Sequence, residues 1–120
     1  MARLRHLALI VDDPDASAAF FAKAFGMERV ADIPAGCHMT DGTVSIALLR
    51  RDPGEEIGID HFGLLVDDLD ATAHAAVAAG ASLLSPVPSG SHAAYEMKLR
   101  TPDGMVFDLS DTGWPGATGD

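Results

Sequence analysis

Cysteine is almost absent from this chain. Cys37 is the single thiol among 120 residues, which excludes an internal disulfide and any zinc site built from several cysteines. A chain without disulfides is typical of a reducing compartment, and we therefore expect a cytoplasmic protein.

Basic residues and long hydrophobic runs are also scarce. Eight Lys and Arg stand against 18 Asp and Glu, a formal charge of −10, so no basic stripe is available to neutralise phosphates. We expect neither nucleic acid nor an anionic membrane surface as a partner. The first apolar run, residues 7–11, ends at two aspartates and is too short for a signal peptide or a membrane span.

Several catalytic motifs are missing as well. The chain has no glycine-rich phosphate loop, no GxSxG turn and no Ser/His/Asp order, so nucleotide-dependent chemistry and nucleophilic hydrolysis have no support. The aspartates at positions 12, 13, 67 and 68 lack the glycine and the terminal glutamate of a calcium loop. We interpret them as turn and helix-cap residues.

What the chain does have is an internal repeat. Residues 6–18, HLALIVDDPDASA, align with residues 61–73, HFGLLVDDLDATA, with eight identities in 13 positions. A repeat that occurs twice indicates one supersecondary module that was duplicated. We expect a single domain over residues 1–120. Its parts are module one at about 3–50, a linker at 51–58, module two at about 59–112 and a loose tail at 113–120.

Each module predicts the element order βαβββ. Apolar runs at 4–11 and 59–66 favour strands, and alanine-rich stretches at 15–25 and 70–79 favour helices that end at glycines. The remaining predicted strands are at 28–33, 36–40 and 43–50 in module one and at 82–85, 93–100 and 105–110 in module two. The sequence therefore predicts an α+β fold made of two tandem modules.

Three motifs, HLALIVDD, HFGLLVDD and TPDGMVFDLSD, resemble those of the vicinal oxygen chelate superfamily. That group includes glyoxalase I, extradiol dioxygenases, fosfomycin-resistance transferases, methylmalonyl-CoA epimerase and bleomycin-resistance proteins. The resemblance runs from about residue 3 to about residue 112. It implies a cup-shaped mixed sheet with helices on its outer face, a divalent metal in the cup, a small-molecule substrate and a homodimer.

The resemblance implies three metal ligands, His6, His61 and Asp108. Two histidines at equivalent places in apolar strands need partners in any case, because an unpaired buried polar group costs roughly 1–3 kcal/mol. Imidazole and carboxylate favour Fe(II) or Mn(II), with Zn(II), Ni(II) or Co(II) as alternatives. Asp108 stands where relatives carry Glu, and this shorter side chain leaves a metal-free binding pocket open as an alternative.

A fourth ligand is missing from the family pattern. The corresponding place in module one offers only Ser45, Ile46 or Ala47. By resemblance, the dimer would build each cup from His6 of one chain and from His61 and Asp108 of the other.

Three further residues are candidates for catalysis. By resemblance, Glu96 and Lys98 point into the cup, where they would orient an anionic substrate or move a proton. An exposed strand face with a weak ion pair is the alternative for both. His92 is a candidate acid or base, or else a solvated loop histidine.

Four other residues have chemistry that could serve a binding site. Cys37 and His38 share a short strand and either could line the pocket, whereas His74 is expected to face solvent. Trp114 covers the cup or a dimer surface, or it lies in the loose tail.

These features predict a metal-dependent enzyme that acts on a small oxygen-rich molecule. Three protein ligands match the extradiol dioxygenase pattern better than the four of glyoxalase I, so ring cleavage of a catechol-like compound is the leading reaction. The alternatives are a fosfomycin-type thiol transferase and a metal-free drug-binding protein like the bleomycin-resistance proteins.

Overall fold

The computed structural model describes residues 1–85 and 96–118. In this part of the chain, both halves have the order βαβββ, and the predicted α+β fold of two tandem modules is confirmed. Module one contains β1 (Arg3–Val11), α1 (Pro14–Phe25), β2 (Glu28–Ile33), β3 (Gly36–Thr40) and β4 (Ser45–Arg50). Module two contains β5 (Gly58–Leu65), α2 (Leu69–Ala78), β6 (Ser82–Ser85), β7 (Met97–Arg100) and β8 (Val106–Ser110).

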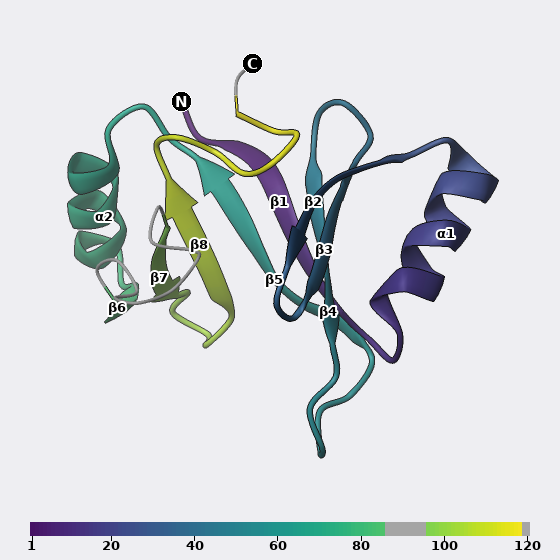
Figure 1. The fold of residues 1–120 in the computed structure, drawn as a ribbon. Coiled ribbons are helices and arrows are strands. Elements are labelled where there is room, and N and C mark those ends of the chain that lie inside the picture. The colour runs from purple at the N-terminus through teal and green to yellow at the C-terminus, as the bar shows by residue number, and fades with distance from the viewer. Residues whose placement is uncertain (86–95, 119–120) are drawn as a thin grey trace.

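The described strands form one mixed sheet in the order β2-β3-β4-β1-β5-β8-β7-β6. Within each module the first strand pairs in parallel with the last, β1 with β4 and β5 with β8. The two modules join through the antiparallel pair β1 and β5. Figure 1 shows α1 and α2 at opposite ends of this sheet, one with each module.

Aspartates and glycine set the helix ends, as the sequence predicts. The Asp13 carboxylate caps α1 by accepting from the amides of Asp15 and Ala16, and Gly26 ends the helix in the left-handed region at φ 70°. In α2 the Asp68 carboxylate accepts from the amide of Ala71. None of the described helices is long and apolar enough to cross a membrane.

Each module buries its own apolar cluster between helix and sheet. In module one, Cys37, Met39 and Leu48 pack with Ala18 of α1. Module two has a matching cluster around Leu99 and Ala73 of α2. Because strand residues alternate between faces, the opposite face of the sheet is left for polar side chains.

Two predicted strands begin at least two residues later in the structure. The strand expected at 43–50 begins at Ser45, because the Asp41 carboxylate binds the amides of Thr43 and Val44 in a turn. The strand expected at 93–100 is described only as Met97–Arg100, since residues 93–95 lie outside the described residues.

The expectation of a loose tail is wrong for residues 113–117. Trp114 and Ala117 are buried, and their backbones pair with each other. The physical reason is the large apolar surface of the indole, which is removed from water against the polar face of the sheet.

Candidate metal centre

Three neighbouring strands carry the predicted metal ligands. His6 of β1 is the register partner of Gly63 in β5, and Gly63 is in turn the partner of Asp108 in β8. His61 precedes Gly63 by two residues on β5 and therefore shares its face of the sheet. Because Gly63 has no side chain, there is space between His6 and Asp108, and the indole of Trp114 occupies it.

Both histidines lie next to an irregularity of the β1–β5 pair. The register shifts between Leu4 and His6, where Arg5 is the extra residue, and again where Asp60 is extra beside His61. Such bulges re-aim the neighbouring side chains and are frequent at functional sites.

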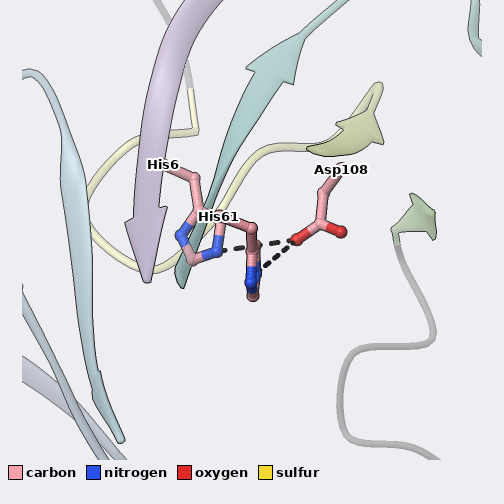
Figure 2. Close-up of side chains that lie close together, drawn as sticks. All are labelled: His6, His61 and Asp108. Carbon is pink, nitrogen blue, oxygen red and sulfur yellow. Dashed lines mark ion pairs between the residues drawn. The ribbon is translucent and has the colours of Figure 1, made fainter. Parts of the chain in front are cut away.

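Figure 2 shows the three side chains pointing toward one another. Oδ2 of Asp108 lies 3.0 Å from Nε2 of His61 and 3.7 Å from Nε2 of His6. One ligand atom from each of the three residues lies within 4.8 Å of the others. His6 and Asp108 are buried, and His61 is nearly so.

Unpartnered atoms indicate that these residues fit a divalent cation. Among the described residues, neither Oδ2 of Asp108 nor Nδ1 of His6 has a hydrogen-bond partner, although both atoms are buried. Ligand atoms at neighbouring positions around a metal are roughly 3 Å apart when each metal–ligand distance is about 2.1 Å. The spacing of Oδ2 and the two Nε2 atoms is compatible with such an arrangement.

Burial and charge set the protonation states of the three residues. Burial lowers the pKa of His6 to about 3, which leaves a neutral imidazole with a free lone pair at neutral pH. Burial also acts to lower the pKa of His61, but the carboxylates of Asp108 and Asp60 outweigh it and raise the pKa. Burial acts to raise the pKa of Asp108, yet its partners, His61 first, hold it below the usual range.

Asp60 is a functional residue that the sequence analysis missed. Its Oδ2 lies 2.7 Å from Nδ1 of His61, which fixes the imidazole so that Nε2 faces Asp108. Consecutive residues of a regular strand point to opposite faces, so the side chains of Asp60 and His61 are not expected to touch from the sequence alone. Only the irregular register at Asp60 brings the two side chains together.

Lys98 and Glu96 lie beside Asp108. Nζ of Lys98 is 2.7 Å from Oδ1 of Asp108, its register partner across β7 and β8. Glu96 is buried, and Oε2 accepts a hydrogen bond of 2.8 Å from Nε1 of Trp114. Burial, helped by a hydrogen bond with Asp108, raises the pKa of Glu96 to about 7. The alternative of an exposed strand face is therefore wrong for Glu96.

The remaining candidates take different places. His38 is buried with Nδ1 3.1 Å from Oγ of Ser45. Cys37 packs in the helix-side cluster of module one rather than at the site. His74 is exposed on α2, as predicted, and His92 lies outside the described residues.

Of the three positions considered for a fourth ligand, Ala47 corresponds to Asp108, because Ala8 pairs with Ala47 as Gly63 pairs with Asp108. Alanine has no ligand atom in its side chain.

One chain supplies all three predicted ligands. The expectation that His6 comes from one chain and that His61 and Asp108 come from another is therefore wrong for this structure. The reason is topological: β1 and β5 pair directly, which places the first strands of both modules side by side.

Comparison with protein-family models gives a match over residues 3–109. The chain belongs to the Glyoxalase/Bleomycin resistance protein/Dioxygenase superfamily. This result confirms the resemblance drawn from the three sequence motifs. A comparison with curated protein sequences gives no match.

Solved structures of this superfamily share the fold. The Mn(II)-bound glyoxalase from Novosphingobium aromaticivorans matches 100% of this chain and 43% of its own, with 29% identity and a TM-score of 0.73. The 2,3-dioxygenase LapB from Pseudomonas sp. KL28 matches 98% of this chain and 43% of its own, with 18% identity and a TM-score of 0.72. This chain thus spans less than half the length of either protein.

A methylmalonyl-CoA epimerase is similar over nearly its whole length. The Streptomyces coelicolor enzyme matches 89% of this chain and 94% of its own, with 19% identity and a TM-score of 0.72. Glyoxalase, dioxygenase and epimerase chains therefore all share this superfamily fold, and the fold does not choose among their reactions.

Proposed function

We propose that the chain is a metal-dependent enzyme acting on a small molecule with neighbouring oxygen atoms, and that His6, His61 and Asp108 hold the metal. The observation that carries this proposal is the buried Oδ2 of Asp108, which faces Nε2 of both histidines without a hydrogen bond among the described residues. A divalent cation would be held between this oxygen and the two imidazoles. Two imidazoles and one carboxylate suit Fe(II) or Mn(II) best, with Zn(II), Ni(II) or Co(II) as alternatives.

Extradiol-type ring cleavage of a catechol-like substrate is the reaction we favour, with dioxygen as co-substrate. Its support is the three-ligand set, because Ala47, the counterpart of Asp108 in module one, has no ligand atom in its side chain. Three protein ligands leave positions open for two substrate oxygens. When bound, the metal supplies Lewis acidity toward those oxygens.

Lys98 and Glu96 are the proposed catalytic residues in the described part of the site. The Lys98 ammonium lies beside Oδ1 of Asp108 and is partly exposed, so it can also hold an anionic substrate oxygen. Glu96, with a pKa near 7, can hold or release a proton at neutral pH. His92, outside the described residues, keeps its predicted role as a further acid or base.

Proton transfer on a substrate carbon, as in an isomerase or lyase of the glyoxalase kind, is a second candidate. Glu96 favours it, because a buried carboxyl that titrates near neutrality suits a general base. This reaction consumes no dioxygen, which separates it from ring cleavage. A fosfomycin-type transfer would instead require a thiol.

A metal-free drug-binding pocket is less well supported. That reading requires the histidines to be hydrogen-bonded core residues. Within residues 1–85 and 96–118, however, Nδ1 of His6 has no hydrogen-bond partner.

A homodimer remains part of the proposal, with each chain holding a complete site. Its support is an apolar hollow of about 740 Å³ lined by both first strands, with Leu7 and Phe62 as register partners within it. Ile59 and Met105 at this hollow are 72% and 56% exposed, and a contiguous exposed apolar patch is typical of an interaction surface. Light scattering should give twice the chain mass for the native protein and a monomer for Ile59→Asp.

The experiment that tests the function is oxygen uptake. The chain is loaded with Fe(II) and supplied with a panel of catechols under air, and Asp108→Ala treated in the same way is the control. We expect oxygen consumption and ring-cleaved product from the native protein alone. If no catechol reacts while Fe(II) still raises the melting temperature, the dioxygenase assignment is wrong and the metal site stands.

A further inference from the structure

The segment that follows β8 crosses the sheet toward module one. Figure 1 shows this segment passing from β8 over β5 and β1. At its far end, Oγ1 of Thr40 in β3 donates a hydrogen bond of 3.1 Å to the carbonyl oxygen of Gly116. Residues 113–117 therefore connect the end of module two with the third strand of module one.

Trp114 on this segment touches both halves of the proposed site. Its indole stacks on the imidazole of His6, with the ring centroids 4.9 Å apart and the planes 9° from parallel. Its Nε1 donates to Oε2 of Glu96 at 2.8 Å. One side chain, 1% exposed, thus contacts a proposed ligand and a proposed catalytic residue.

Two glycines make room for this arrangement. A Cβ at Gly63 would lie 2.7 Å from Cζ2 of Trp114, and a Cβ at Gly116 would lie 2.6 Å from Cβ of Thr40. Gly116 also has φ of 81°, a conformation that side-chain-bearing residues rarely adopt. Gly63 therefore leaves room for the indole, and Gly116 lets the segment lie against Thr40.

The two histidines differ in what holds their rings. A ligating imidazole is normally oriented by a hydrogen bond from its second nitrogen, and Asp60 makes that contact to His61. Nδ1 of His6 has no hydrogen bond among the described residues. The His6 ring also lies near the rings of His38 and His61, but both contacts are tilted and longer. The parallel stack on Trp114 is the contact that restrains the plane of the His6 ring.

We propose that Trp114 is a positioning residue of the metal centre, which holds the His6 ring by stacking where no hydrogen bond does so. The inference rests on the proposed function, since it assumes that His6 is a ligand. It predicts that the aromatic face of residue 114 matters for metal affinity and that its indole N–H matters less.

The test compares Trp114→Phe with Trp114→Leu by titration with Co(II). Loss of an outer contact to a ligating histidine typically weakens metal binding by about 10- to 100-fold. We expect Trp114→Leu to fall in that range and to change the visible absorption of bound Co(II). Trp114→Phe, which keeps a stacking face, should retain the native spectrum. A folded Leu variant with native affinity and spectrum overturns the proposal.

Two controls separate positioning from general loss of stability. Leu48→Ala removes a buried side chain of the helix-side cluster and should lower stability while leaving Co(II) affinity unchanged. If Trp114→Leu does not fold, Gly116→Ala displaces the segment with the indole intact and should also weaken binding. Native affinity in Gly116→Ala then overturns the proposal.

The native protein provides an independent readout, because Trp114 is its only tryptophan. Co(II) should quench the tryptophan emission and saturate at one equivalent per chain. Tight Co(II) binding with unchanged emission overturns the positioning role alone. Absence of Co(II) binding by the native protein overturns the proposed function, and the positioning role with it.

Discussion

Lys98 and Asp108 are register partners across β7 and β8, and Nζ of Lys98 lies 2.7 Å from Oδ1 of Asp108. This contact occupies one oxygen of a fully buried carboxylate and leaves the other, Oδ2, facing the two histidines. Lys98 therefore balances the negative charge of Asp108. Its own positive charge also repels a metal cation that binds at Oδ2 of Asp108.

Replacing Lys98 with Met should have opposite effects on the metal-free and metal-bound protein. The metal-free protein should lose about 1–3 kcal/mol of unfolding free energy, because the buried carboxylate loses a charged hydrogen-bond donor. Metal should then stabilise the variant more than the native chain. Melting curves with EDTA and with Mn(II) measure both effects. Lys98→Arg, which keeps the charge, is the control, and an equal Mn(II)-induced gain in all three proteins would refute the assigned role.

Ser45→Ala tests whether the hydroxyl beside His6 contributes to the metal site. The variant removes the hydroxyl that contacts His38 in a buried environment, so we expect a loss of about 1 kcal/mol in unfolding free energy. Metal affinity should stay native, because Ser45 is not among the proposed ligands. A tenfold loss of Mn(II) affinity in calorimetric titration would show that the hydroxyl contributes to the site.

Asp41 should stabilise the β3–β4 turn in a pH-dependent manner. Hydrogen bonds from the amides of Val44 and Thr43 lower the pKa of Asp41. Its ionised form then contributes fully above the unfolded pKa of about 3.9, and the contribution is lost as the pH falls through the folded pKa. Denaturant unfolding should show Asp41→Ala less stable by about 1 kcal/mol at pH 7, since the carboxylate is exposed.

The matched control for this turn is Asp41→Asn, which keeps an acceptor without the charge. Its stability should lie between those of the native chain and Asp41→Ala at pH 7. The native advantage over Asp41→Asn should narrow near pH 3. A difference that is constant from pH 7 to pH 3 would contradict this account.

Cys37 should be inert in the folded protein. Its side chain is fully buried, and burial raises the pKa of the thiol, so little thiolate forms at neutral pH. A chromogenic disulfide reagent should detect no reactive thiol in the native state and one per chain in denaturant. Rapid native-state labelling would mean that the cluster around Met39 and Leu48 opens easily.

Much of the fold was predictable because it follows from local chemistry that occurs twice. Asp13 and Asp68 cap equivalent helices, and His6 and His61 occupy equivalent strands, so the repeat alone predicts two modules. Asp108 was identified by resemblance, because relatives carry a carboxylate a few residues after the Pro-Asp-Gly turn. The sequence therefore predicted the residues that the structure brings together.

Two kinds of contact could not be predicted from the sequence. One kind depends on irregular backbone, and the other depends on how the two modules pair. The contact between Asp60 and His61 depends on a register shift, and no residue in this segment predicts such a shift. Burial of Trp114 depends on the space that Gly63 leaves by lacking a side chain, and this space forms only when β1, β5 and β8 lie side by side. Pairing of β1 with β5 also places all three ligands in one chain, contrary to the expected sharing between two chains.

The central claim is that His6, His61 and Asp108 bind one divalent cation, and the most direct measurement is calorimetric titration of metal-free protein with Mn(II). Asp108→Ala removes the carboxylate, and Asp111→Ala removes an exposed aspartate close by in sequence and serves as the matched control. We predict one Mn(II) per chain in the native protein and in Asp111→Ala, and no binding in Asp108→Ala. Equal binding by all three proteins, or by none of them, would contradict the account.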